Sequence, residues 1–205
     1  MRVPWTQGAW SNAPAAVEPD GDDLLVTAVE SSDAWRHTAY GYVHASEHAL
    51  LAAFRPDSAV EVEFTAALTE QFDQAGLFLR ASDERWVKAT AEYADGELGI
   101  GAVVTDGNSD WSVSPAPDLP NQRVVFRASW SGDAVTVRAG RAGQPLRLLR
   151  VLPFASTGDV TAGPLVCAPS RAGLTVRFRA VAACSAQASS VAASFATAPS
   201  RRLLR

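Results

Sequence analysis

Side chains able to hold a polar, ring-shaped ligand are concentrated between Phe72 and Tyr93. Residues 74–80 and 86–92 alternate in character on both sides of a short polar break, as half-buried antiparallel strands of one hairpin do. One face of this predicted hairpin is apolar, and the other mixes aromatic rings, an amide and both signs of charge. Rings supply a stacking surface for a sugar, while polar neighbours orient it. The mixed face consists of Gln74, Phe78, Trp86, Lys88 and Glu92.

Further candidates lie in segments that we expect to border this face as loops. The glycines Gly99 and Gly101 either leave room for a ligand or mark a bulge or bend. A plainer interpretation stays open, in which the tryptophans complete a second small core and the charged residues are merely solvated. The candidates for the rim of this binding face are Asp33, Trp35, Arg36, Asp110 and Trp111.

Glycoside hydrolysis is an alternative to simple binding. It needs two carboxylates about 5–9 Å apart across a cleft, and Glu92 with Asp110 or Asp33 could supply them. The Glu-x-Asp-x-x-Glu signature of lectin-like glucanases is absent. We therefore assign no catalytic residue and keep weak hydrolase activity as an alternative.

Two motifs suggest metal binding, but their surroundings argue against it. His44 to His48 fits H-x-x-E-H, which binds zinc on a helix, yet residues 40–43 predict a strand and favour a turn here. Asp106 to Asp110 begins like a calcium loop, but Trp111 replaces the glycine that follows in an EF-hand. We expect neither a metal nor a cofactor.

The positioning elements are predicted to be strands. Residues 60–68 alternate strictly between apolar and polar side chains, and residues 124–130 show an apolar row at every second position. Asp95-Gly96 is a strong hairpin signal and leads into residues 98–105, where a row of four apolar side chains alternates with two glycines and Val103. About a dozen short strands without a long amphipathic helix indicate a β-sandwich or barrel.

Composition narrows the class of protein. With 20% charged residues and a net charge of −4, the chain of 205 residues lacks the basic surface of a nucleic-acid binder. It has no apolar run long enough to span a membrane. Two cysteines, Cys167 and Cys184, favour a reduced, cytoplasmic protein. We expect a single domain over residues 1–183 and an Ala/Ser-rich flexible tail over 184–205, for which a short helix is the alternative.

Several segments, in order over about residues 24–180, together resemble a domain-of-unknown-function family that includes the yeast regulation-of-enolase protein. The combination of Asp-Gln-Ala-Gly-Leu with Trp-x-Lys is specific. The matching segments are 33–42, 72–77, 86–88, 92–93, Thr105, 109–112, 149–150 and 163–173.

The resemblance implies an all-β fold, a jelly-roll β-sandwich of two curved antiparallel sheets similar to concanavalin A-like lectins and glucanases, with a groove on the concave sheet. It implies carbohydrate-related work, although a fold alone does not establish function. The family name implies a metabolic-enzyme partner as an alternative. We expect a carbohydrate-binding module with a sugar or glycan ligand, and the family supplies no agreed catalytic residues.

Overall fold

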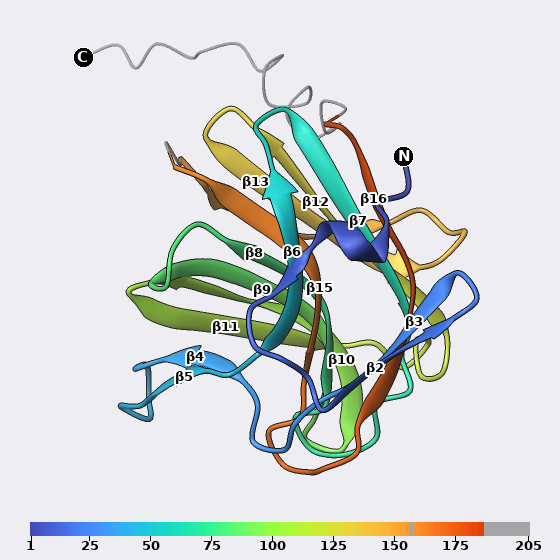
Figure 1. Ribbon diagram of the computed structural model, residues 1–205. Coiled ribbons are helices and arrows are strands. Elements are labelled where there is room, and N and C mark those ends of the chain that lie inside the picture. The colour runs from blue at the N-terminus through green and yellow to red at the C-terminus, as the bar shows by residue number, and fades with distance from the viewer. Residues whose placement is uncertain (156–157, 187–205) are drawn as a thin grey trace.

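Two antiparallel sheets of seven strands each enclose an apolar core in this computed structural model, which describes residues 1–155 and 158–186 (Figure 1). In spatial order, the first sheet contains β1 (Ala9–Trp10), β6 (His48–Phe54), β15 (Val160–Cys167), β8 (Gln74–Arg80), β9 (Arg85–Ala94), β10 (Glu97–Asp106) and β11 (Asn108–Pro115). The second contains β14 (Arg147–Pro153), β13 (Ala134–Arg141), β12 (Arg123–Ser131), β7 (Ser58–Thr65), β16 (Thr175–Ser185), β3 (Asp23–Thr27) and β2 (Ala16–Asp20). The predicted β-sandwich is confirmed.

Two small elements lie outside these sheets. A 3-10 helix, η1, covers Trp5–Gln7. The strands β4 (Ala34–Arg36) and β5 (Val43–Ala45) pair only with each other among the described residues. Figure 1 shows this β4–β5 hairpin beside β11, outside both main sheets. In the described part of the chain, no helix is long and apolar enough to cross a membrane.

The central predicted hairpin is formed by β8 and β9. Their register pairs Gln74 with Glu92 and Phe78 with Lys88, which places these four side chains on one face of the first sheet. The alternate residues point between the sheets, where Leu77 and the other apolar residues of the row join the main core. The predicted division into an apolar and a mixed face is confirmed.

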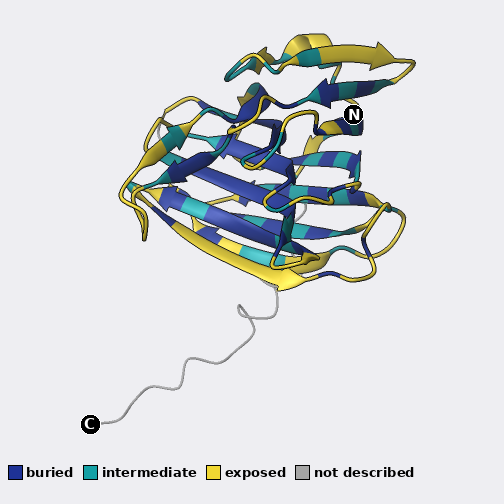
Figure 2. Cartoon of the chain, turned by 90° about the horizontal axis from the view of Figure 1, so that it is seen from below, coloured by how far each residue is buried: buried dark blue, intermediate teal, exposed yellow. Residues whose placement is uncertain are grey.

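The main core fills the space between the sheets. Phe64 of β7 packs against Phe126 of β12 and Phe178 of β16, with ring centroids 6.0 and 5.9 Å apart. Figure 2 shows buried residues along the middle strands and exposed ones at turns and edges. Because this core is continuous across both sheets, it holds the outer face of the first sheet in a defined shape.

The paired glycines of β10 do not leave space for a ligand. A Cβ atom on Gly101 would lie 2.1 Å from the carbonyl oxygen of Ser112, and one on Gly99 would lie 2.6 Å from a methyl of Val113. Both atoms belong to β11, so the neighbouring strand occupies these positions. Of the two explanations considered from the sequence, ligand space is therefore wrong for this pair.

The end of the domain differs slightly from the predicted boundary. The last strand, β16, continues to Ser185, so residues 184 and 185 belong to the sandwich. Its pairing with β7 extends to Ser58. The predicted tail otherwise falls on residues 187–205, which lie outside the described residues.

Candidate functional site

The β4–β5 hairpin covers part of the outer face of the first sheet. Trp35 packs there into a second, smaller cluster, and its indole nitrogen donates a hydrogen bond to the Thr38 carbonyl at 3.0 Å. Arg36, the next residue of β4, donates a side-chain hydrogen bond at 3.0 Å to the Gly107 carbonyl in the β10–β11 turn. The buried members of the cluster are Ala34, Trp35, Ala49, Phe78, Trp86, Val103, Leu165 and Cys167.

This cover changes the role of two predicted ligand contacts. Phe78 and Trp86 are only 1% and 5% exposed, and their ring centroids lie 5.4 Å apart. A sugar ring cannot stack on faces that the hairpin already covers, so the stacking role expected for these two residues does not fit. Trp35 and Trp86 belong to a second small core, as in the plainer interpretation, and Phe78 is part of the same cluster.

A buried ion pair lies next to this cluster. The Lys88 side chain is 2% exposed, and its ammonium nitrogen lies 2.6 Å from a carboxylate oxygen of Asp33. The same oxygen accepts a hydrogen bond from the backbone N–H of Ala34 at 2.8 Å. Burial opposes the charge on Lys88, but the attraction of Asp33 and of other nearby anions outweighs it, and the pKa of Lys88 is raised. The ion pair links the sheet to the base of the hairpin.

Glu92 and Gln74 lie side by side on the same face. Glu92 is 4% exposed, and the Gln74 amide donates a hydrogen bond to it at 3.4 Å. Burial, helped by the negative charge of Asp33 and opposed by Lys88 and by a hydrogen bond to Trp111, raises the pKa of Glu92 to about 7. Within the described residues, the Gln74 side-chain oxygen has no hydrogen-bond partner. An unused acceptor therefore lies beside a carboxyl that can exchange a proton near neutral pH.

These polar groups line a cavity of about 480 Å³, which we call the hairpin pocket. Its walls carry exposed aromatic rings, of which Tyr40 is the most open, at 61%. Trp35, Tyr40, Tyr42 and His44 form a chain of ring contacts with successive centroid distances of 5.8, 5.5 and 4.8 Å. Phe72 and Trp111 also line the pocket. The pocket thus combines aromatic walls with a buried polar floor.

The structure brings together six of the ten predicted site residues in this pocket. They are Asp33, Trp35, Gln74, Lys88, Glu92 and Trp111. Arg36 instead pairs with Glu84 at 2.9 Å, outside the pocket lining. Asp110 also lies outside it, paired with Arg150 of β14 at 2.9 Å.

Sequence reasoning missed four aromatic members of the pocket: Tyr40, Tyr42, His44 and Phe72. A usable signal was present, because two tyrosines flank Gly41 in a segment too polar for a core strand. Gly41 has a φ of +73°, and the segment forms the turn between β4 and β5. Exposed rings on a turn are candidates for ligand contact.

The zinc motif is not on a helix. His44 belongs to β5 and His48 to β6, with the expected turn between them. The two ring nitrogens of His48 are occupied: Nε2 accepts from the Val29 N–H at 3.0 Å and Nδ1 lies 3.1 Å from the Asn12 carbonyl. Burial lowers the pKa of His48. Among the residues that the structure describes, no three potential ligand side chains are grouped for a metal ion.

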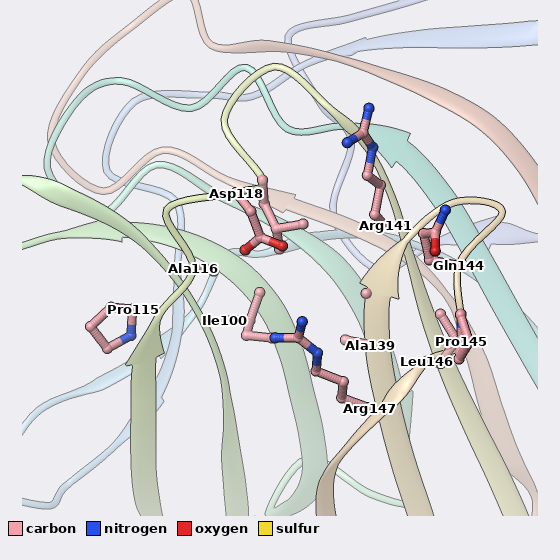
Figure 3. Close-up of a pocket in the computed structure, with 12 residues that line it drawn as sticks. Ile100, Pro115, Ala116, Asp118, Ala139, Arg141, Gln144, Pro145, Leu146 and Arg147 are labelled. Atoms are coloured by element: carbon pink, nitrogen blue, oxygen red, sulfur yellow. The ribbon is translucent and has the colours of Figure 1, made fainter.

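Another cavity of similar size, about 510 Å³, lies at the edge between the sheets (Figure 3). Ile100, Leu119 and Leu146 contribute apolar surface to it. Its charged residues, such as Asp118 and Arg147, are exposed. It contains no predicted site residue and no buried charge, whereas the hairpin pocket contains both. We therefore take the hairpin pocket as the candidate site.

Comparison with known proteins places the chain in a family. It belongs to the family described as protein of unknown function DUF1349, whose model matches residues 10–196. Over 174 residues it is 30% identical to regulation of enolase protein 1 of Saccharomyces cerevisiae, covering 84% of this chain and 87% of that protein.

Solved structures show the same fold. A functionally unknown protein from Saccharomyces cerevisiae superposes with a TM-score of 0.84 and 27% identity, over 89% of this chain and 98% of that one. A xylan β-1,4-xylosidase from Bacillus halodurans gives a TM-score of 0.61 at 14% identity, over 78% of this chain and 32% of that one. An alginate lyase from Klebsiella pneumoniae gives a TM-score of 0.55 at 10% identity, over 82% of this chain and 84% of that one. At these low identities, the last two likenesses concern the fold alone.

Proposed function

We propose that this protein is a carbohydrate-binding module that holds a sugar or glycan end in the hairpin pocket. The observation that carries the proposal is the combination of exposed rings on the walls with buried, hydrogen-bonding side chains on the floor. Tyr42, Phe72 and Trp111 offer apolar faces to a sugar ring. Gln74 and Glu92 lie where its hydroxyls would reach.

The chemistry of the floor suits hydroxyl groups. A hydroxyl both donates and accepts hydrogen bonds. The unused Gln74 oxygen can accept one, and the Lys88 ammonium can donate another beside Asp33. The similar fold of a xylan β-1,4-xylosidase supports carbohydrate-related work in general terms. We infer binding rather than catalysis, because binding a sugar needs only the exposed rings and the hydrogen-bonding side chains of the hairpin pocket.

A glycan array with point variants tests the proposal. Trp111→Ala and Tyr42→Ala remove exposed pocket rings without opening the core, and each should lower the array signal about tenfold or more, as loss of a stacking ring does. Trp5→Ala is the matched control, because Trp5 lies on η1 and outside the pocket lining. Equal signals from all four proteins, or no signal from wild type, would refute the proposal.

A regulatory module that binds a metabolic enzyme is the second candidate. The name of the yeast relative, regulation of enolase protein 1, is the observation that favours it. In a pull-down with purified enolase, retention that is independent of added sugar and of Trp111→Ala would support this candidate over the first. Such a role fits a cytoplasmic protein with free thiols at Cys167 and Cys184.

Weak glycoside hydrolysis is the third candidate, and Glu92 is the reason to keep it. A carboxyl with a pKa of about 7 can donate a proton at neutral pH. Its neighbour Asp33 is already engaged by Lys88. Release of reducing sugar from oligosaccharides that the wild type binds, lost in Glu92→Gln while binding remains, would identify hydrolysis.

A further inference from the structure

The β4–β5 hairpin separates the hairpin pocket from a smaller hollow on the outer face of the first sheet. This second hollow measures about 160 Å³. His44 of β5 lines both cavities. The covered rings of Phe78 and Trp86 reach the second hollow rather than the hairpin pocket. The two cavities are therefore neighbours across one strand of the hairpin.

A buried carboxyl lines this second hollow. Glu47, in the turn between β5 and β6, is 4% exposed. In the part of the chain that the structure describes, it forms no ion pair. Burial raises its pKa, and hydrogen bonding to its own backbone and to Ser11, with the charges of Arg80 and Lys88, opposes the rise only partly. Because Glu47 lines the hollow, its carboxyl is a candidate hydrogen-bond acceptor for a group bound there.

Hydrogen-bond donors also line this hollow. Arg36 and Arg80 both line the hollow. Arg36 forms an ion pair with Glu84 at 2.9 Å, and Arg80 forms one with Asp83. These pairings orient the guanidinium groups and leave further N–H donors on each. The Asn12 amide, also in the lining, donates to the Glu47 backbone carbonyl at 2.9 Å.

The second hollow thus repeats the composition of the hairpin pocket. Each has a buried glutamate, a basic side chain, a side-chain amide and aromatic carbon in its lining. Such a mixture of donors and acceptors matches a polyhydroxylated ligand better than a simple anion, which Glu47 would repel, or a simple cation, which the two arginines would repel.

We propose that the second hollow is a subsite for the next unit of the same saccharide chain, so that the protein binds an oligosaccharide across the β4–β5 hairpin. This inference rests on the proposed carbohydrate-binding function. His44 would contact both units. Affinity should therefore rise with chain length, and side chains of the second hollow should affect only ligands of two or more units.

A length series on the glycan array tests the subsite. Monosaccharide to tetrasaccharide members of one linkage type, such as the xylose and glucose series, are compared for wild type, Glu47→Gln and Arg80→Gln. Wild type should bind the disaccharide or trisaccharide about tenfold more tightly than the monosaccharide, and both variants should lose that gain while keeping the monosaccharide signal. If Glu47→Gln folds poorly, Arg80→Gln still tests the subsite. Arg138→Gln on β13 is the matched control, because Arg138 lines neither cavity.

The outcomes separate the two proposals. Length-independent binding by wild type, or variants that retain the full length gain, would overturn the subsite and leave the hairpin pocket standing. Absence of binding to every saccharide would overturn the proposed function, and the subsite with it. A length gain that Glu47→Gln and Arg80→Gln remove, but Arg138→Gln does not, supports the subsite.

Discussion

The ammonium nitrogen of Lys88 lies 2.6 Å from a carboxylate oxygen of Asp33, and this pair joins the middle of the first sheet to the hairpin above it. Asp33→Asn would leave the Lys88 charge buried without its partner, which costs about 3 kcal/mol of unfolding free energy for a well-buried pair and somewhat less here, because Asp33 is partly exposed. Urea unfolding measures the loss. The double variant Asp33→Asn/Lys88→Met should recover part of it, and additive losses would show that the two residues are not coupled.

Glu92 should make the protein less stable as the pH rises. Its pKa is about 7 in the folded protein, against 4.5 for an ordinary glutamate. The folded state therefore holds the proton more tightly than the unfolded state. The stabilisation is fully present below pH 4.5 and is lost as pH rises to about 7, by at most ~3 kcal/mol.

Glu92→Gln should flatten this dependence, because the amide keeps a neutral group in place. Unfolding free energies measured between pH 4.5 and 8 should show the variant more stable than wild type at the alkaline end. The exposed Glu97, on the next strand, supplies the control: Glu97→Gln should leave the slope as it is in wild type. A Glu92→Gln profile parallel to that of wild type would contradict the prediction.

Gly101 is required by the close approach of β11. An added Cβ would lie 2.1 Å from the Ser112 carbonyl oxygen, and backbone cannot move aside as a flexible side chain can. Gly101→Ala should cost about 2–3 kcal/mol or more. Gly140→Ala is the matched control, because its Cβ would meet neighbours at an ordinary 3.6 Å. Thermal denaturation compares the two, and equal melting temperatures would be inconsistent with the strand packing described.

The two thiols should differ sharply in reactivity. Cys167 is buried in the cluster beneath the hairpin, where burial raises its pKa well above the ordinary value. Cys184 is exposed on β16. A thiol reagent should therefore modify Cys184 rapidly in the folded protein and Cys167 only after unfolding. Rapid labelling that persists in Cys184→Ser would show that the cluster opens on the time scale of the reaction.

The strands of the sandwich were predictable because their signals are local. Alternation along residues 74–80 and 86–92 sets which side chains share a face, and the short loop between them makes the strands neighbours. From this alone, Gln74 and Glu92 could be placed side by side. The Asp95-Gly96 turn likewise brought β9 and β10 together, as their register shows.

What the sequence did not reveal depends on contacts between distant segments. Trp86 is covered by a hairpin that begins about fifty residues earlier in the chain, at Ala34, and no local pattern records that cover. Asp110 was expected at the rim of the groove, but Arg150 from the edge of the other sheet engages it. Exposure and ion pairing of outward-facing residues are set by tertiary packing, which alternation does not describe.

The turn that joins β4 and β5, residues 37–42, adds aromatic surface to the hairpin pocket but none of its residues belongs to the core between the sheets. Its anchorage comes instead from Trp35 and from the ion pair at its base. Under the proposed binding function, substitutions in this segment should alter which ligand is bound and have little effect on folding, except at Gly41, whose φ of +73° favours glycine. For the proposed binding module, deliberate redesign of ligand preference can be concentrated in this one exchangeable segment.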